Sequence, residues 1–563
     1  MGFDKKKLLY QEWKNNLELD EEMREILSSA TPTELSNAFD SELEFGTAGI
    51  RGIMGAGPGR FNVYTIKKVT RGYAQLLKEK YPNQLSQGVV VGHDSRHNST
   101  KFAQLTAEVL TSEGIKVYLF KKNQMQPTPV VSFATRKLKA LGGIVITASH
   151  NPAEYNGYKI YDSTGCQLMP QDTDIISQEI SKIDDILIWN FQPQKKLISK
   201  VPHKVIRAYK KMINNLQFYP RSLSKVNLKI VYSSVNGTGG LYTPKLLKHQ
   251  GYEVIEVKEH SQPDENFTYV GNPNPEFSPV WKYPLAYAKQ HDADLILIND
   301  PDADRLGVGI KTKKGYEILT GNQVGALLIN WKLSQMKLKH TLPSNPVMYS
   351  SFVTADLGDR IAEDEYQVKV IKTLTGFKWM GHEMNQEPER GLNFVFAYEE
   401  SIGYVLDDST RDKDGIQAAV MIAELAWKTK VDFRTLSDVL DDIYKKYGYY
   451  DTTTINLNFK PEEKTAKIDP IMQELRTKGL VQLADSKIEK TEDYLPGLYN
   501  MPGQNLLKFY FQDGSWIALR PSGTEPKLKI YFNIIATSAR KAKSTQVKLE
   551  KALRELLNLP QKK

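Results

Sequence analysis

The chain of 563 residues has little cysteine and no long apolar run. Its single cysteine, Cys166, cannot form an internal disulfide, which fits a reducing cytoplasm. No helix N-terminus or flanking base marks Cys166 as a nucleophile, so we expect it to pack in the core. No segment approaches the roughly 18 apolar residues of a membrane span, and residues 1–8 lack both the apolar stretch of a secretory signal and the Ser/Thr of a myristoylation signal. We therefore expect a cytoplasmic protein.

The composition is that of an ordinary globular protein, with 40% apolar and 25% charged residues. The length exceeds what one core supports and predicts about three to five domains. The net charge of +9 comes without a zinc-knuckle, RNP or basic-region pattern. A solvated basic surface explains the excess, and its field would attract small dianionic substrates. We therefore expect small-molecule partners, and neither nucleic acid nor membrane.

An apolar strand, a helical stretch and a second apolar strand recur three times, beginning near residues 88, 228 and 346. Each unit is about the minimum for a parallel crossover, and each is followed by one more apolar strand that ends in a polar loop. From about residue 444 the chain instead alternates strands and ends in a basic helix. This predicts three successive, similar α/β domains with mixed sheets and a smaller α+β C-terminal domain, around a central cleft. The predicted domains are 1–208, 209–323, 324–442 and 443–563.

Three carboxylates on alternate positions, Asp300, Asp302 and Asp304, follow the last apolar strand of the second unit. On an extended backbone this spacing turns the side chains the same way. Three converging negative charges repel one another, and a hard cation such as Mg²⁺ resolves that conflict. An EF-hand is excluded, because its loop needs Gly and Glu where this chain has Arg305 and Lys311. Standing alone, the segment would be better interpreted as a solvated acidic turn.

The polar loop of the first unit, residues 147–152 (TASHNP), presents Ser149 on a tight turn beside His150. A serine hydroxyl is a weak nucleophile that needs a base, a metal or a strong field. The Gly-x-Ser-x-Gly elbow of acyl-transfer enzymes is missing. With a metal site elsewhere in the chain, phosphoryl transfer through a phosphoserine is the sharper hypothesis, and a plain turn residue is the alternative.

The C-terminal region contains a segment suited to binding phosphate, residues 520–527 (RPSGTEPK). It offers a guanidinium fork, two hydroxyls, a glycine-exposed backbone and an ammonium, which together match the donors that bind phosphate. The alternative is a hairpin loop with incidental charges.

The loop of the third unit offers carboxylates and a hydroxyl at Glu399, Glu400 and Ser401, suited to gripping sugar hydroxyls. Glycosidases also take carboxylate pairs from such loops, but adjacent residues on one loop rarely straddle a glycosidic bond.

In their order, these four loops resemble the four signature loops of the α-D-phosphohexomutase superfamily. The resemblance begins at residues 45–52 (FGTAGIRG) and extends to Lys527. Within the superfamily, residues 373–381 (TLTGFKWMG) and 398–404 (YEESIGY) resemble the phosphoglucomutase/phosphopentomutase-type branch.

The resemblance implies an intramolecular phosphotransferase that interconverts glucose 1-phosphate and glucose 6-phosphate. Ser149 would carry the phosphate, and a bound sugar 1,6-bisphosphate would be both intermediate and activator. One Mg²⁺ per chain would be bound by the phosphoryl group on Ser149 together with Asp300, Asp302 and Asp304.

The resemblance also implies roles for residues around the serine and the substrate. Arg51, His150 and Lys159 would surround Ser149, and Lys378 would be the acid/base, provided that burial near cations lowers its pKa. The alternatives are that Lys378 only binds phosphate and that Lys159 only pairs with a carboxylate. The substrate would be held by Arg305, Thr375, Gly376, Glu399, Ser401, Arg520, Ser522, Gly523, Thr524 and Lys527.

Other substrates and functions stay open at this point. Tyr404 stands where phosphomannomutase-like relatives carry His, which counts against mannose phosphate as the main substrate. Phosphopentomutase activity on ribose or deoxyribose phosphates is the close alternative. A catalytically idle sugar-phosphate sensor is disfavoured by the intact Ser149 and three aspartates, and a metal-dependent phosphatase would release free phosphate. We expect phosphosugar substrates and a monomer or homodimer.

Overall fold

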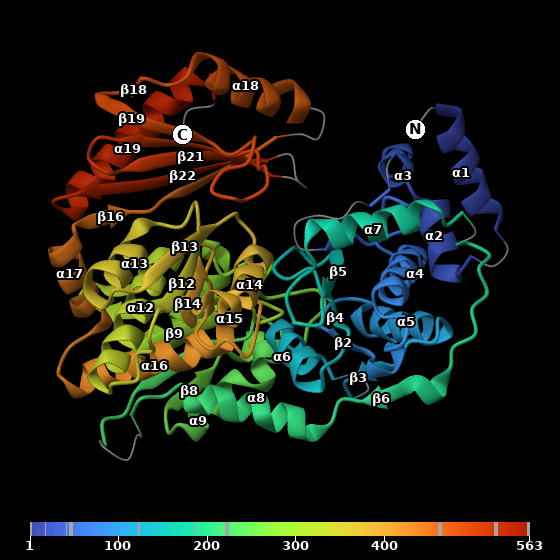
Figure 1. Cartoon of the computed structure of the whole chain (residues 1–563), viewed down its shortest axis with the longest axis horizontal. Coiled ribbons are helices and arrows are strands. Elements are labelled where there is room, and N and C mark those ends of the chain that lie inside the picture. The colour runs from blue at the N-terminus through green and yellow to red at the C-terminus, as the bar shows by residue number, and fades with distance from the viewer. Residues whose placement is uncertain are drawn as a thin grey trace.

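The structure is a computed structural model, and its strands form four sheets that succeed one another along the chain (Figure 1). Within the part of the chain it describes, no helix combines the length and apolar character that a bilayer span requires. The described residues are 3–16, 19–40, 42–43, 49–121, 124–184, 186–219, 225–459, 464–522 and 527–559.

The first three sheets repeat one arrangement of four strands. The first strand lies between the second and the third and runs parallel to both, while the fourth runs antiparallel to the third. In the first sheet these strands are β2 (Val89–His93), β3 (Val117–Leu119), β4 (Gly142–Ile146) and β5 (Tyr155–Tyr161). In the second they are β7 (Lys229–Ser233), β8 (Glu253–Glu256), β9 (Leu295–Asn299) and β10 (Leu306–Thr312). In the third they are β12 (Pro346–Ser351), β13 (Lys369–Thr373), β14 (Asn393–Glu399) and β15 (Gly403–Val405). The prediction of three similar α/β domains with mixed sheets is confirmed.

This arrangement gives all three sheets a polar turn at the same place, between the third and the fourth strand. Ser149 follows β4, the three aspartates follow β9, and Ser401 follows β14. The strands before these turns are apolar and buried on both faces, so each polar turn emerges at an edge of a packed sheet. Polar groups at the carboxyl ends of such strands are the usual place for chemistry in α/β proteins.

Helices cover these sheets and join the domains. Around the first sheet lie α4 (Val63–Lys80), α5 (Ser99–Ser112), α6 (Thr128–Leu138) and α7 (Pro170–Ser181), and α8 (His203–Asn215) leads to the second sheet. The second and third domains add α9 (Thr243–His249), α11 (Lys282–His291), α12 (Gly321–Leu338), α14 (Phe377–Asn385), α16 (Gly415–Val431) and α17 (Leu436–Tyr447). Helix α16 is apolar and buried almost all round, because it packs on the second sheet as well as on α12. One apolar core therefore joins these domains.

The C-terminal domain has the alternating strands and terminal helix that its sequence predicts. Its sheet is antiparallel between β19 (Ser486–Asp493), β20 (Leu507–Phe511), β21 (Trp516–Pro521) and β22 (Lys527–Ala536). Helices α18 (Asp469–Lys478) and α19 (Ala539–Leu556) pack on it around a separate apolar core. A smaller cluster at Phe352, Tyr494 and Trp516 connects this domain to the third.

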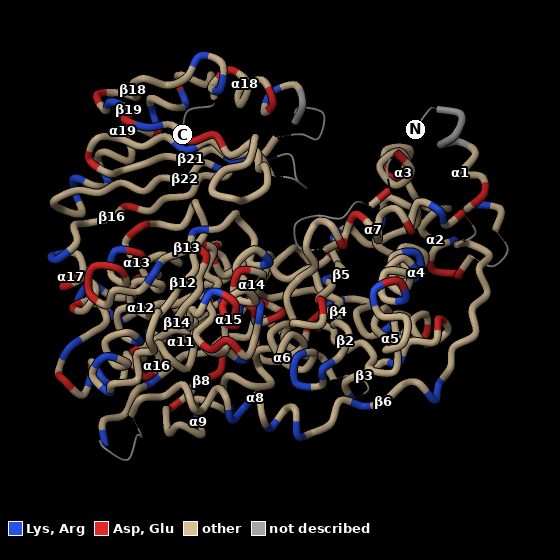
Figure 2. Tube along the Cα trace, in the orientation of Figure 1, with Lys and Arg blue, Asp and Glu red and all other residues tan. Residues whose placement is uncertain are grey.

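Three N-terminal helices were missed by the sequence analysis: α1 (Phe3–Asn15), α2 (Glu21–Ser29) and α3 (Pro32–Phe39). They pack on the first domain through buried apolar side chains such as Trp13, Met23 and Phe39. Figure 2 shows Lys and Arg, mixed with Asp and Glu, in every domain.

Candidate active site

Ser149 lies against the aspartate loop, although 151 residues separate it from Asp300. Its hydroxyl donates to Asp300 Oδ2 at 2.9 Å and lies 3.2 Å from Nδ1 of His150. The side chain is buried, and its backbone is left-handed, with φ +52°. For a residue other than Gly this conformation is strained and persists only where the surroundings impose it.

Arg96, which the sequence analysis missed, imposes that conformation. Its buried guanidinium donates to the carbonyls of Ser149 at 2.7 Å, Pro152 at 2.7 Å and Tyr155 at 3.0 Å. It also stacks on the ring of Phe267 in the second domain, 5.1 Å from the ring centre. One rigid fork thus fixes the serine turn and ties it to the domain that carries the aspartates.

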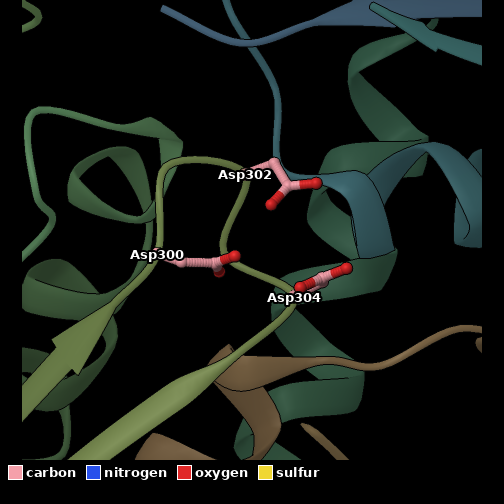
Figure 3. A group of neighbouring side chains, drawn as sticks. All are labelled: Asp300, Asp302 and Asp304. Carbon is pink, nitrogen blue, oxygen red and sulfur yellow. The ribbon is translucent and has the colours of Figure 1, made fainter. Parts of the chain in front are cut away.

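The three aspartates Asp300, Asp302 and Asp304 are buried, and they offer oxygens that all lie within 4.8 Å of one another (Figure 3). Their convergence was predicted, but the predicted cause was wrong. The segment is a tight turn rather than an extended strand: the amide of Ala303 donates to the carbonyl of Asp300 at 2.9 Å, and Ala303 has φ +56°.

Cations and a hydroxyl from other domains surround these carboxylates. Lys159 Nζ lies 2.7 Å from Asp302 Oδ2 and 3.1 Å from Asp304 Oδ2. Thr128 donates its hydroxyl to Asp302 Oδ2 at 2.8 Å. Lys413 Nζ lies 3.4 Å from Asp304 Oδ2. In the described part of the chain, Asp302 Oδ1 and Asp304 Oδ1 are buried without a hydrogen-bond partner.

The buried carboxylates of the triad repel one another, and a divalent cation would relieve that repulsion. Burial, and then the charges of Asp304 and Asp302, raise the pKa of Asp300 well above its usual range. Burial would raise that of Asp304 too, but Lys159 and Lys413 hold its pKa well below the usual range. Two unpartnered oxygens beside a carboxyl that resists ionisation fit a hard divalent cation with oxygen ligands.

Lys159 and Lys413 are ion-pair partners in this arrangement. Burial would lower the pKa of each, but Asp302 and Asp304 raise that of Lys159, and Asp304 and Asp412 raise that of Lys413. A lysine with a raised pKa is a poor proton acceptor, so the geometry favours the alternative that Lys159 pairs with carboxylates.

Lys413 was missed by the sequence analysis, as was its neighbour Asp412. Lys413 Nζ lies 3.0 Å from Asp412 Oδ1, and Asp412 Oδ2 accepts from Tyr161 at 2.8 Å and from Gln167 at 2.6 Å. The loop before α16 thereby connects the third domain to the first and the second. Alternating charges in residues 411–414 (RDKD), just before an apolar helix, are the signal that could have found it.

His150 and Arg51 lie around the serine, as the resemblance implies. Burial, and then Arg305 and Arg51, hold the pKa of His150 well below its usual range, so its imidazole is neutral at neutral pH. Arg51 donates to Asn151 Oδ1 at 3.0 Å, and its buried Nε has no hydrogen-bond partner among the described residues.

Lys378 lies at the start of α14 and is buried. Burial lowers its pKa, which is the direction a proton-transfer role requires. Cys166 is buried beside it, as predicted: its thiol lies 3.3 Å from the carbonyl of Lys378, and burial raises the pKa of the thiol.

The turn that joins β14 to β15 presents Glu399 toward the segment that precedes α14. Glu399 Oε1 accepts from the amide of Gly376 at 2.8 Å, and burial raises the pKa of this carboxyl. Thr375 Oγ1 is buried without a hydrogen-bond partner in the described part of the chain, while Ser401 is half-buried. Glu400 instead accepts from hydroxyls of its own domain.

The phosphate loop joins β21 to β22, and the amide of Ser522 donates to the carbonyl of Lys527 at 2.8 Å. Gly523 and Thr524, both predicted to bind substrate, lie outside the described residues. Arg520 faces Lys529 directly across the strand pair. Lys529 was missed, although its spacing of two from Lys527 places both on one face of β22.

Arg305 connects the aspartate turn to Glu276 in its own domain and to β15 in the third domain. Its amide donates to Asp300 Oδ1 at 3.0 Å, and its guanidinium lies 3.1 Å from Glu276 Oε2. Its backbone pairs with that of Gly403, the first residue of β15.

Comparison with known proteins covers nearly the whole chain. The family description "Phosphoglucomutase/phosphomannomutase" matches as alpha/beta/alpha domain I over residues 42–186, domain II over 207–314, domain III over 320–447 and the C-terminal domain over 455–552.

Among curated relatives, the phosphoglucomutase of Staphylococcus haemolyticus is 37% identical over 521 residues, which is 90% of this chain and 93% of that protein. The phosphoglucomutase of Staphylococcus epidermidis is 36% identical over 535 residues, which is 92% of this chain and 95% of that protein.

Solved structures share the fold at lower identity. The pp63/parafusin phosphoglucomutase of Paramecium in its open form superposes with a TM-score of 0.69 at 18% identity, over 92% of this chain and 96% of that one. A putative phosphomannomutase of Thermus thermophilus gives 0.68 at 22% identity, over 92% and 99%. The chain therefore belongs to the phosphoglucomutase/phosphomannomutase family of the α-D-phosphohexomutase superfamily.

Proposed function

We propose that this chain is a phosphoglucomutase that interconverts glucose 1-phosphate and glucose 6-phosphate through a phosphoserine at Ser149. The observation that carries the proposal is the hydrogen bond of 2.9 Å between the Ser149 hydroxyl and Asp300. It places a strained, buried hydroxyl at a carboxylate triad that has two unpartnered oxygens. The names of the Staphylococcus relatives support glucose phosphates as substrates.

Asp300, Asp302 and Asp304 would hold one Mg²⁺ together with the phosphoryl group on Ser149. When bound, Mg²⁺ neutralises the charge that builds up on a transferring phosphoryl group. Around it, Arg96 holds the serine turn, and Nδ1 of the neutral His150 imidazole lies within hydrogen-bond distance of the serine oxygen. Lys159 and Lys413 pair with Asp302 and Asp304 and hold these two carboxylates in place.

Transfer breaks the bond between phosphorus and the Ser149 oxygen and forms one to a substrate hydroxyl, whose proton must go to a base. We propose Lys378 as that base, because its burial favours the neutral amine. The sugar bisphosphate then turns over in the cleft, and its other phosphoryl group returns to Ser149. The Ser149 oxygen leaves the first transfer as an anion and attacks in the second, and the proton on Lys378 passes to the sugar oxygen that the second transfer frees.

Turning over requires one site that holds whichever phosphate is not reacting. We assign this to Arg520, Ser522 and Lys527, joined by Lys529 on the same strand face, with Gly523 and Thr524 in the same loop. Glu399 and Ser401 would grip ring hydroxyls in both orientations, with Thr375 and Gly376 beside them. Arg305 would contact phosphate from the aspartate turn.

Further features of the proposal follow from the sequence. The enzyme is proposed to act in the cytoplasm as a monomer or homodimer and to need a trace of sugar 1,6-bisphosphate for activation.

The test is Ser149→Ala, assayed for conversion of glucose 1-phosphate to glucose 6-phosphate with Mg²⁺ and a trace of glucose 1,6-bisphosphate. Because the serine oxygen is the nucleophile, we expect turnover to fall by about 10⁴-fold or more. Ser177→Ala, on the exposed face of α7 in the same domain, is the control and should leave turnover unchanged.

Activity that survives in Ser149→Ala would refute the phosphoserine scheme. Release of inorganic phosphate in place of isomerisation would identify a phosphatase. The ratio of kcat/KM for glucose 1-phosphate to that for ribose 1-phosphate separates a hexose mutase from a pentose mutase.

A further inference from the structure

The guanidinium of Arg305 lies between two carboxylates that compete for it. Glu276 Oε2 accepts from it at 3.1 Å, whereas Asp304 Oδ1 lies 3.8 Å from Arg305 Nε. The longer separation exceeds the range of a hydrogen bond. In the described part of the chain, both Arg305 Nε and Asp304 Oδ1 are buried without a hydrogen-bond partner. A donor and an acceptor of opposite charge therefore face each other and do not meet.

Glu276 is the other carboxylate at this guanidinium, and its backbone is fixed by its own domain. Its amide donates to Asn274 Oδ1 at 3.0 Å, and the indole of Trp281 donates to the carbonyl of Pro275 at 2.8 Å. Trp281 is buried against β10, the strand that leaves the aspartate turn, where a methyl group added at Gly307 would lie 3.0 Å from its ring. The position of Glu276 is thus set relative to Asp304.

We propose that Glu276 is a positioning residue: it holds the Arg305 guanidinium away from Asp304, so that Asp304 Oδ1 stays available to the divalent cation. The inference rests on the proposed function in one respect, that the aspartate triad holds a metal. It goes beyond that function, because Glu276 contributes no ligand to the metal and acts only through Arg305.

Removing Glu276 has a definite consequence. The freed guanidinium closes the short gap to Asp304 Oδ1 and forms a charge-assisted hydrogen bond there. A metal ion must then displace Arg305 before it can use that oxygen. Such a bond between charged groups corresponds to about tenfold or more in an equilibrium constant.

The experiment measures binding of Mn²⁺, as the probe for the divalent site, to the full chain by electron paramagnetic resonance of the free ion. We expect Glu276→Ala to weaken Mn²⁺ binding by about tenfold. Glu276→Gln should stay within about twofold of the wild type, because its amide oxygen still accepts from Arg305. Glu265→Ala removes a carboxylate from the same domain that pairs with His97 instead, and should bind Mn²⁺ like the wild type. Thermal unfolding checks that all variants are folded.

The two substitutions at Glu276 separate positioning from a simple loss of negative charge. Long-range attraction predicts equal losses for Ala and Gln, and equal losses would overturn the inference. If Glu276→Ala bound Mn²⁺ as tightly as the wild type, the inference about Glu276 would be overturned, but the proposed metal site would not. A wild-type chain that binds no Mn²⁺, or whose Mn²⁺ binding survives Asp302→Asn, would instead overturn the proposed metal site and the inference with it.

Discussion

The two ends of the site handle charge in opposite ways. At the aspartate turn, Asp302 and Asp304 pair with cations from other domains: Lys159 from the first and Lys413 from the third. At the phosphate loop, Arg520 and Lys529 face each other across two antiparallel strands. In the described part of the chain, neither of these two cations forms an ion pair. Like charges directly opposite on neighbouring strands are destabilising.

The difference shows which end of the site already has ion-pair partners before substrate binds. The aspartate turn is fixed by contacts among three domains, so its geometry is built during folding. The strand pair β21–β22 brings two cations opposite each other, and an anionic ligand would satisfy both. The proposed mechanism would use both, since the proposed reacting end must stay rigid while the proposed phosphate-holding end must accept and release two different phosphates.

The largest effect is expected from Lys413→Met, which breaks the compensated end. Lys413 is buried between Asp412 and Asp304, so its removal leaves two buried carboxylates short of a cation. Breaking a buried ion pair on one side costs about 3–5 kcal/mol of folding free energy. Chemical unfolding followed by tryptophan fluorescence should show this loss.

Lys428→Met is the matched control, because it removes a lysine of α16 whose partner Asp432 is one turn away at the surface. That pair should contribute about 0.5 kcal/mol or less. Adding Asp304→Asn to Lys413→Met should recover part of the lost stability through their coupling. A Lys413→Met protein as stable as the Lys428→Met control would mean that the compensation described above does not hold the turn.

A second prediction concerns Lys508, a cation of the C-terminal domain that is buried without full compensation. It donates to the carbonyl of Phe352 in the third domain at 2.9 Å and lies over the ring of Trp516 at 3.8 Å. Burial lowers its pKa to about 8, against about 10.4 in an unfolded chain. Between these values the unfolded chain binds more protons, so stability should rise with pH, by about 2–3 kcal/mol in all.

Unfolding midpoints at pH 7 and pH 10 test this, with Lys508→Met lacking the rise. Lys487→Met, an exposed lysine on the neighbouring strand β19, should keep the wild-type rise. If the wild type and Lys508→Met changed in parallel with pH, Lys508 would not be the titrating group.

The sequence predicted the elements of the site better than their assembly. Strands such as 295–299 and their polar turns carry local signatures, namely an apolar run and then small or charged residues. The strands of the first three sheets, and the pair of strands on either side of residues 520–527, followed from those signatures. The tight turn at Ala303 did not, because alternate spacing is equally compatible with an extended strand.

Three of the residues that the sequence analysis missed share one physical property: their partners are distant in sequence. Arg96 acts on a turn more than fifty residues away, Lys413 on an aspartate more than a hundred away, and Glu276 on Arg305, 29 residues away. No periodicity records such contacts, since they arise when whole domains pack. The domain boundaries, the roles of Gly523 and Thr524, and the identity of the acid/base stay predictions.

The smallest effect on folding, and the sharpest test of the open end, is expected from Lys529→Met. Removing one of two directly opposed cations should leave stability unchanged or raise it by up to about 1 kcal/mol. The KM for glucose 1-phosphate should rise about tenfold with little change in kcat, because a contact to the non-reacting phosphate stabilises ground state and transition state alike. The measurement is steady-state kinetics of Lys529→Met, with Lys487→Met, which changes an exposed lysine of the same sheet, as the control. A fall in kcat at unchanged KM would place Lys529 at the reacting phosphate, and a loss of stability would show that its charge is compensated after all.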